Sequence, residues 1–383
     1  MNQSSRILIV DDNADNRELL SRLLTRQGHE TLMANDGKEA LECLAKTPVD
    51  LVLLDIMMPV MGGIETLSRI KADEALRHLP VIVVSALDDV DNVVKCIELG
   101  AEDYLFKPVN KVILNARVST SLEKKRLRDQ EQAYMQHVRQ ELELGRQIQT
   151  DFLPATLPET SGWECAVSFH PAFEVAGDFY DLFQLGENKL CLVIADVCGK
   201  GVGAALFMAL VRSLTRAFAE QADAAGETVL RAVELTNSYI TRHHRQRKSY
   251  MFATLFFGAL DTTTGVMDYT TAGHYPPLVL GADGSISSLE LCGPALGITG
   301  DTTFEIKRIV IPKGASLFAY TDGVIEAKNA TEELFSQERL LSILQSPSPS
   351  AQAVLDRIEE CLRVYTGDTE QSDDITMMAV RRL

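Results

Sequence analysis

The sequence lacks the features of secreted and membrane-spanning proteins. Its seven cysteines are scattered, odd in number and without a Cys-x-x-Cys pair, so neither a disulfide framework nor a zinc site is expected. No apolar run approaches the roughly 18 residues of a membrane span, and the N-terminus has no signal-peptide core. We therefore expect a cytoplasmic protein with reduced thiols and no membrane contact.

Positive charge is also scarce, because the chain carries a net charge of −17. Such a chain repels phosphate backbones, and it offers no basic helix-turn-helix segment, so nucleic acid is not expected as a partner. The apolar fraction of 46% and the charged fraction of 24% are ordinary for a globular protein. The length of 383 residues allows two domains and a linker. We divide the chain into 1–121, 122–158 and 159–383.

The first region alternates short apolar strands with amphipathic helices, which predicts a parallel sheet covered on both faces. The predicted strands are Ile7–Val10, Thr31–Ala34, Asp50–Leu54, Val81–Val84 and Tyr104–Phe106. The predicted helices are Asn16–Arg26, Gly37–Lys46, Gly63–Lys71, Asp89–Leu99 and Val109–Leu122.

The second region, 122–152, is charged, rich in glutamine and free of proline, which predicts a long helix. Apolar or small residues recur at steps of three and four, as in a coiled-coil seam. The seam comprises Met135, Val138, Leu142, Gly145, Gln149 and Phe152. Since Gly145 and Gln149 are poor core residues, a parallel coiled-coil homodimer through this linker remains open. Whether the linker transmits a signal or is a passive spacer also remains open. Two prolines in LPATLP (153–158) end the helix.

The third region has strands in hairpin-like runs, which predicts an α+β domain of two antiparallel sheets with helices outside. The predicted strands are Glu164–His170, Leu190–Ala195, Tyr250–Leu260, Val266–Thr271, Phe304–Ile311, Ser316–Tyr320 and Ile375–Arg381. The predicted helices cover about 203–220, 227–246, 336–345 and 349–365.

In the first region, each strong strand runs directly into a polar residue. These residues are Asp11 with Asp12, then Asp55, Ser85 and Lys107. The carboxyl ends of parallel strands line one edge of the sheet, where ligands bind. Three carboxylates there repel each other, which Mg²⁺ relieves, and a lysine and a hydroxyl suit a phosphoryl group carried on one carboxylate.

The segments ILIVDD, LVLLDIMMPVMGG, VIVVSA and DYLFKP make residues 5–120 resemble a bacterial response-regulator receiver domain, with a flavodoxin-like doubly wound sheet. The resemblance implies that Asp55 is the phosphoacceptor. It also implies that Asp11 and Asp12 hold Mg²⁺ together with Asp55 and the backbone carbonyl of Met57.

The same resemblance implies that Ser85 and Lys107 contact the phosphoryl oxygens and that Tyr104 is the switch aromatic. The phosphoryl donor is then expected to be a cognate histidine kinase or a phosphotransfer protein.

The glycine-rich stretch ADVCGKGVGAAL (195–206) does not fit a nucleotide-phosphate loop. A P-loop needs four residues between its first glycine and the Gly-Lys pair, whereas Lys200 follows Gly199 directly. A dinucleotide loop fits weakly, because no acidic residue ends a second strand about 20 residues later. The remaining interpretations of this stretch are a metal-binding loop and an ordinary tight turn.

Acidic residues at several other strand ends favour a metal site. Asp178, Asp196, Asp322 and Asp373 stand beside small residues at predicted strand ends. Such a set is what two oxygen-ligated divalent cations need, although each Asp-Gly pair taken singly is also typical of a turn.

The segments EVAGDFYD, ADVCGKGVGAALFMA, TAGHYPPL, GPALGI, AYTDGVIEA and SDDITMMAV follow in order across 160–383. They resemble the SpoIIE/RsbU-like branch of the metal-dependent serine/threonine phosphatases, the PPM superfamily. The resemblance implies a Mn²⁺ or Mg²⁺ pair bridged by Asp196, with the Val197 carbonyl on one ion. The resemblance also implies that Asp322 and Asp373 coordinate the other ion, and that Asp178 binds a metal ion or a water on it.

Two positions depart from the pattern of that branch: Ala176 replaces a glycine and Lys200 replaces a histidine. Neither change removes a ligand. We expect direct attack of water on phosphorus without a covalent enzyme intermediate, because coordination to such cations lowers the pKa of water toward about 7. His274 is expected to fix its loop rather than to act as a general acid.

The resemblance implies that the substrate is a phosphorylated STAS-type anti-sigma-factor antagonist. A different reading is a non-catalytic adaptor that binds a sigma factor or a similar partner through a phosphatase-like domain. The presence of Asp178, Asp196, Asp322 and Asp373 favours catalysis. The segment ELELGRQIQTDFLPATLP (141–158) resembles the regulatory helix before RsbU-like phosphatase domains, which implies that phosphorylation of Asp55 acts through it.

Overall fold

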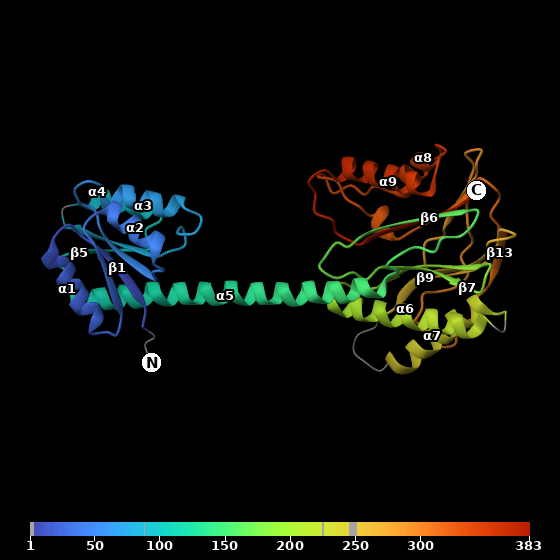
Figure 1. Ribbon diagram of the computed structural model, residues 1–383, viewed down its shortest axis with the longest axis horizontal. Coiled ribbons are helices and arrows are strands. Elements are labelled where there is room, and N and C mark those ends of the chain that lie inside the picture. The colour runs from blue at the N-terminus through green and yellow to red at the C-terminus, as the bar shows by residue number, and fades with distance from the viewer. Residues whose placement is uncertain (1–3, 88, 224–225, 245–250) are drawn as a thin grey trace. The chain divides into compact units, whose positions relative to one another are not determined.

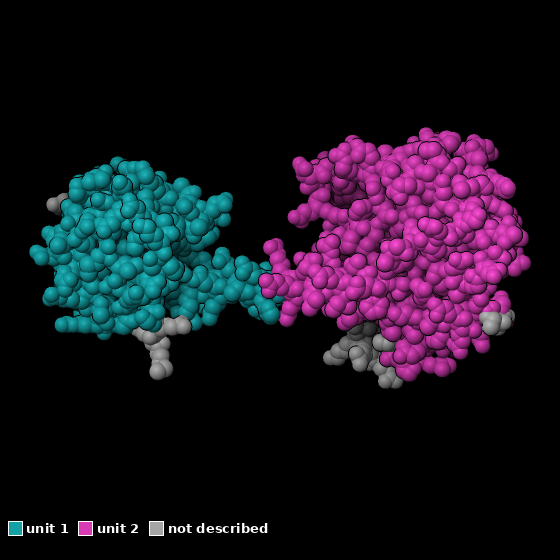
Figure 2. Space-filling view, viewed as in Figure 1, with its two compact units in different colours: residues 1–138 teal, residues 139–383 magenta. Residues whose placement is uncertain are grey.

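The computed structural model describes residues 4–87, 89–223, 226–244 and 251–383. The chain divides into two compact units, residues 1–138 and 139–383 (Figure 2). Each unit has its own apolar core, so each is described by itself.

The first unit contains a five-stranded parallel sheet in the order β2-β1-β3-β4-β5 (Figure 1). Buried side chains of α1 and α5 cover one face, and those of α2, α3 and α4 cover the other. This arrangement confirms the predicted doubly wound fold. The strands are β1 (Arg6–Val10), β2 (Glu30–Ala34), β3 (Leu51–Asp55), β4 (Val81–Ala86) and β5 (Asp103–Lys107). The helices are α1 (Ala14–Thr25), α2 (Gly37–Lys46), α3 (Gly63–Ala72), α4 (Val90–Glu98) and α5 (Lys111–Phe152).

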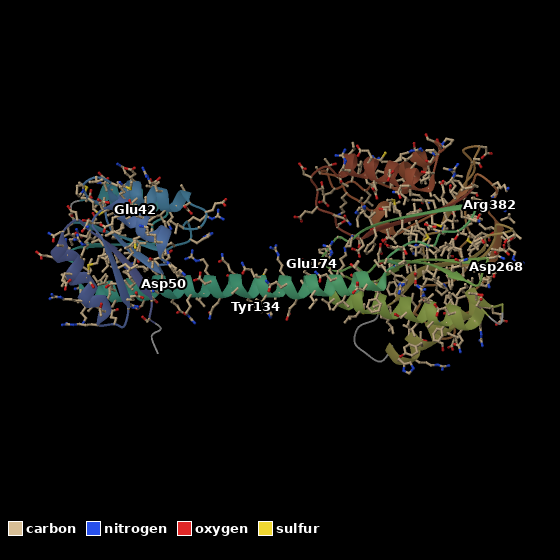
Figure 3. All side chains as sticks on the ribbon, viewed as in Figure 1. Glu42, Asp50, Tyr134, Glu174, Asp268 and Arg382 are labelled. Atoms are coloured by element: carbon tan, nitrogen blue, oxygen red, sulfur yellow. The ribbon has the colours of Figure 1, made fainter. Side chains whose placement is uncertain are left out.

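Helix α5 is 42 residues long and joins the last predicted helix of the first region to the predicted linker helix. Asn110 begins it by accepting a hydrogen bond from the Val112 backbone N–H (2.9 Å), and Pro154 follows its end. Its middle is exposed, as the side chain of Tyr134 shows (Figure 3). Near its end, Gln149 is buried against Ala176, so this residue of the predicted seam makes a contact inside the second unit.

The second unit is a sandwich of two five-stranded antiparallel sheets, as predicted. The first sheet has the order β13-β10-β9-β8-β7, and the second has the order β12-β11-β14-β15-β6. An apolar core fills the space between them. Helices α6 and α7 pack on the outer face of the first sheet, and α8 and α9 on that of the second (Figure 1).

The strands of the second unit are β6 (Trp163–His170), β7 (Phe179–Leu185), β8 (Lys189–Val197), β9 (Ala253–Asp261), β10 (Val266–Ala272), β11 (Leu278–Leu280), β12 (Ile286–Ser288), β13 (Lys307–Val310), β14 (Ser316–Tyr320) and β15 (Ile375–Arg382). The helices are α6 (Val202–Asp223), α7 (Thr228–His244), the short 3-10 helix η1 (Asp322–Val324), α8 (Gln337–Leu344) and α9 (Ala351–Thr366).

The predicted strands do not include β7, so the prediction was wrong for this segment. The structure buries the charged residue Asp181 within this strand. The guanidinium of Arg212, on α6, lies 2.9 Å from the Asp181 carboxylate and makes this burial possible. The short strands β11 and β12 were also not predicted. The predicted positions 245–246 and 250 lie outside the described residues.

Helix α6 is long and apolar enough to cross a membrane by length and composition alone. Its buried side chains belong to the core that α6 forms with β7 and β8, and include Phe207, Met208 and Val211. Its apolar face is therefore explained by packing in the second unit.

Candidate functional site

The acidic edge of the first unit brings together the side chains that the sequence predicts. Asp11, Asp12 and Asp55 each offer a carboxylate oxygen within 4.8 Å of the others. The ammonium of Lys107 lies 2.9 Å from Asp11 and 2.8 Å from Asp55. Burial is the main cause that raises the pKa of Asp55, and Lys107 opposes it. A hard divalent cation fits this donor set, because it offsets the mutual repulsion of the carboxylates.

Three further predicted residues lie on the same or neighbouring segments. Ser85 is buried near the end of β4, where its hydroxyl donates to Ala86 O and to the Asp89 carboxylate at 3.3 Å each. Tyr104, on β5, packs edge-on against the ring of Phe106 on the same strand. The guanidinium of Arg117, on α5, lies over the Tyr104 ring. Met57 exposes its side chain, while its backbone N–H donates to Asp55.

A second acidic centre lies in the second unit, where acidic residues of both sheets converge. The ladder of β7 with β8 ends at the pair of Phe179 with Ala195, and Asp178 and Asp196 follow directly in the same register. In the other sheet, Asp322 follows β14 and Asp373 precedes β15, two paired strands. Neither sheet carries the whole set.

The pKa values show that these carboxyls are close enough to repel one another. Burial, followed by repulsion from Asp322, Asp373 and Asp374, raises the pKa of Asp196 to about 7. Burial, followed by repulsion from Glu326 and Asp373, raises the pKa of Asp322 to about 6. Desolvated carboxylates that repel each other are suited to bind cations.

The second centre is wider than the first. Across the described residues, the trio within 4.8 Å is that of the first unit, and the acidic residues of the second unit do not form so tight a group. A wider set fits a pair of cations, since each ion then contacts only some of the carboxylates.

Asp374 is a site residue that the sequence analysis did not identify. Its carboxylate accepts hydrogen bonds from the backbone N–H groups of Ala172 (2.8 Å), Gly177 (2.7 Å) and Asp178 (3.3 Å). It therefore anchors the loop that carries Asp178. The Asp-Asp pair at 373–374 was the available signal, but only the fold distinguishes the anchor from the candidate ligand.

Lys200, one of the two residues that depart from the resembled pattern, lies beside the second centre. Its ammonium is 3.1 Å from the Asp373 carboxylate, donates to the Ser372 carbonyl and lies over the ring of Phe173. The side chain is about half exposed, so it remains accessible to a ligand.

The glycine-rich stretch forms the turn between β8 and α6. Gly199 and Gly201 have φ angles of +99° and +74°, which side chains other than glycine rarely adopt. The turn follows Asp196 and Val197 directly and so brings the backbone past the acidic centre. Gly177 has a related role, because a Cβ there would meet the Val197 carbonyl oxygen at 3.0 Å.

His274 is buried, and its Nδ1 lies 2.9 Å from the Thr254 hydroxyl. Burial lowers its pKa to about 4, and a hydrogen bond with the Tyr320 backbone only partly opposes this. The ring is therefore neutral at neutral pH, which agrees with a loop-fixing role rather than general acid catalysis.

Comparison with known proteins agrees with both units. The family model for Stage II sporulation protein E (SpoIIE) matches residues 186–383, and the model for the response regulator receiver domain matches residues 7–119. The chain belongs to the SpoIIE family and carries a response-regulator receiver domain. Its fold classes are those that the sequence predicted.

Among curated proteins, the chain is similar to Protein IcfG of Synechocystis sp., with 42% identity over 267 residues. The match covers 64% of this chain and 42% of IcfG, so the chain spans less than half of that relative.

Two solved structures share the fold. The SiaA-PP2C domain of Pseudomonas aeruginosa matches with a TM-score of 0.54 and 22% identity over 65% of this chain and 98% of that domain. The PP2C phosphatase domain of SpoIIE from Bacillus subtilis, with a fragment of its regulatory domain, matches with a TM-score of 0.50 and 19% identity. That match covers 57% of this chain and 61% of the other.

Proposed function

We propose that this protein is a two-component response regulator whose output is metal-dependent hydrolysis of phosphoserine or phosphothreonine on another protein. The observation that carries the proposal is the convergence of Asp178, Asp196, Asp322 and Asp373 from two sheets onto one centre. A chain that had kept the fold only for binding has no need of this set of mutually repelling carboxyls, of which Asp178 is buried and the other three are half-buried.

In the second unit, Asp196 would hold both ions of a Mn²⁺ or Mg²⁺ pair, and the backbone carbonyl of Val197 would join one of them. Asp322 and Asp373 would hold the other ion, and Asp178 would contact a metal ion or its water. Such cations would supply an activated water and charge neutralisation at the phosphoryl group. Lys200 donates a hydrogen bond to the substrate phosphate, and its half-exposed ammonium 3.1 Å from Asp373 supports this role.

In the receiver domain, Asp55 accepts the phosphoryl group from a histidine kinase or a phosphotransfer protein. Asp11, Asp12, Asp55 and the carbonyl of Met57 would hold Mg²⁺. The position of Lys107, 2.8 Å from Asp55, supports its role as a contact to the phosphoryl oxygens, together with Ser85. Tyr104 reports the phosphorylated state as the switch aromatic.

The substrate that we propose is a STAS-domain anti-sigma-factor antagonist in the cytoplasm, and the active form is a homodimer through α5. Phosphorylation of Asp55 acts on the end of α5, over 147–152. Gln149 supports this route, because its side-chain amide donates to Ala176 O (2.7 Å) and accepts from Ala176 N (2.9 Å). Ala176 lies two residues from Asp178, so a displacement of α5 reaches the acidic centre.

The experiment is Mn²⁺-dependent release of phosphate from p-nitrophenyl phosphate by the full chain. We expect hydrolysis by the wild type and a loss of at least about a hundredfold in Asp196→Asn, because the bridging ligand loses its charge. The matched control is Asp268→Asn, a surface aspartate on β10 that is labelled in Figure 3, which should leave the rate unchanged. If the wild type binds a phosphoprotein but hydrolyses neither that phosphoprotein nor p-nitrophenyl phosphate, the chain is an adaptor.

A further inference from the structure

Two buried threonine hydroxyls donate to one oxygen of Asp178. The distances to Asp178 Oδ2 are 2.7 Å from Thr321 Oγ1 and 2.6 Å from Thr376 Oγ1. All three side chains are buried, and both threonines are 0% exposed. Neither threonine is among the site residues that the sequence predicts.

The two threonines hold each other as well. The Thr321 N–H donates to Thr376 O (3.0 Å), and the Thr376 N–H donates to the Thr321 hydroxyl oxygen (3.1 Å). Thr321 directly follows β14 and Thr376 lies within the adjacent β15, so both belong to one sheet. Asp178 precedes β7, in the other sheet. The pair of hydroxyls therefore connects the two sheets at the acidic centre.

We propose that Thr321 and Thr376 are positioning residues that fix the carboxylate of Asp178 across the sandwich, so that its other oxygen is held toward Asp196 and the cation pair. This inference rests on the proposed function. Each hydroxyl has one proton to donate, and both are directed to the same carboxylate oxygen, which leaves Oδ1 for the site. The β-branched side chain of threonine restricts χ1 and keeps each hydroxyl in place.

The position of each threonine links it to a candidate ligand. Thr321 directly precedes Asp322, and Thr376 lies three residues after Asp373. A shift of either hydroxyl therefore changes the placement of Asp178 relative to the acidic residues of the other sheet. Hydrogen-bonding partners of metal ligands commonly contribute about 10- to 100-fold to metal affinity or activity.

The test compares Thr321→Val and Thr376→Val with Thr321→Ser and Thr376→Ser in the full chain. Valine keeps the shape and removes the proton, whereas serine keeps the hydroxyl. The control is Thr270→Val, at a buried β10 threonine whose hydroxyl has no hydrogen-bond partner within the described part of the chain. The measurements are Mn²⁺ binding by titration calorimetry and the Mn²⁺ concentration that gives half-maximal hydrolysis of p-nitrophenyl phosphate. Cation binding by the receiver is the same in every variant and cancels in the comparison.

We expect each valine variant to bind Mn²⁺ at the phosphatase site at least about tenfold more weakly, with serine variants and the control within about threefold of wild type. Wild-type Mn²⁺ affinity in both valine variants overturns the proposal, as does an equal loss in the serine variants. If a valine variant fails to fold, the Thr321→Ser/Thr376→Ser double variant decides: retained affinity supports the hydroxyl role, and lost affinity overturns it. If the wild type binds Mn²⁺ but releases no phosphate, the hydrolytic function fails while calorimetry still tests the threonines.

Discussion

At the scale of single residues, Asp196 and Asp322 bind protons more tightly than carboxyls in water. Their pKa values are raised to about 7 and about 6 by burial and by their acidic neighbours. Without cations, the folded state therefore binds more protons than the unfolded state between about pH 4 and pH 7. The stability contributed by these two groups is present below the unfolded pKa and is lost as the pH rises through the folded values.

On the proposed function, this linkage predicts how Mn²⁺ changes the stability of the second unit. Cations that bind ionised carboxylates compete with protons, so the increase in melting temperature caused by Mn²⁺ should be larger at pH 8 than at pH 5. In EDTA, the melting temperature of the wild type should fall more from pH 5 to pH 8 than that of Asp196→Asn. Calorimetric melting curves measure both, and an Mn²⁺ effect that is equal at the two pH values contradicts the prediction.

A second residue-scale prediction concerns the buried pair that allows β7 to form. Asp181 lies 2.9 Å from Arg212, and both side chains are largely buried. Replacing Asp181 with alanine leaves a buried guanidinium without its close partner, so we expect the free energy of unfolding to fall by about 3–5 kcal/mol. Urea denaturation measures this change.

The matched control is the surface pair of Asp268 with Arg308, since Asp268→Ala should cost less than about 1 kcal/mol. Equal effects of the two substitutions argue against burial as the cause.

At the scale of elements, the end of α5 contacts the loop that carries Asp178. Its residue Gln149 pairs with both the N–H and the carbonyl of Ala176, and Asp374 holds the same loop through Gly177 and Asp178. The loop before β7 is thus fixed by a helix and by the start of β15. Both attachments act on backbone groups, so they control the position of Asp178 without contacting its carboxylate.

This arrangement predicts a specific effect of Gln149→Ala. The substitution leaves a buried N–H and a buried carbonyl without partners, which costs about 1–3 kcal/mol for each unsatisfied group. We expect a lower melting temperature and at least about a tenfold lower kcat/KM for p-nitrophenyl phosphate. The control is Ile148→Ala, the exposed neighbour on the same helix, which should retain wild-type activity. A Gln149→Ala variant with wild-type kcat/KM excludes α5 from support of the site.

At the scale of the whole molecule, the question is whether Asp55 controls the phosphatase rate. Beryllofluoride on Asp55 mimics the phosphorylated state, and we expect it to raise the rate, because α5 then holds the loop before β7 in its ordered form. Stopped assays of phosphate release measure the rate with and without beryllofluoride. Asp55→Asn should remove the response to beryllofluoride without changing the basal rate. Gln149→Ala should weaken the response to beryllofluoride. An unchanged rate in the wild type rejects the coupling.

Some parts of the molecule follow directly from local sequence pattern. The parallel sheet of the receiver was predicted because short apolar strands such as Leu51–Leu54 alternate with amphipathic helices. The sandwich of the phosphatase domain was predicted from its hairpin-like runs. Strand β7 was missed because burial of Asp181 depends on Arg212, which is 31 residues away in sequence. No pattern within β7 indicates that Arg212 pairs with Asp181.

The sequence by itself determined the two domain types, the acidic residues at the strand ends and the long helix between them, because these depend on periodicity and on the chemistry of short motifs. Only the tertiary structure decided how those acids are held. The roles of Asp374, Gln149, Thr321 and Thr376 arise from contacts between segments that are distant along the chain. Hydrogen bonds between such segments depend on how the sheets pack, and no local pattern of residues encodes that packing.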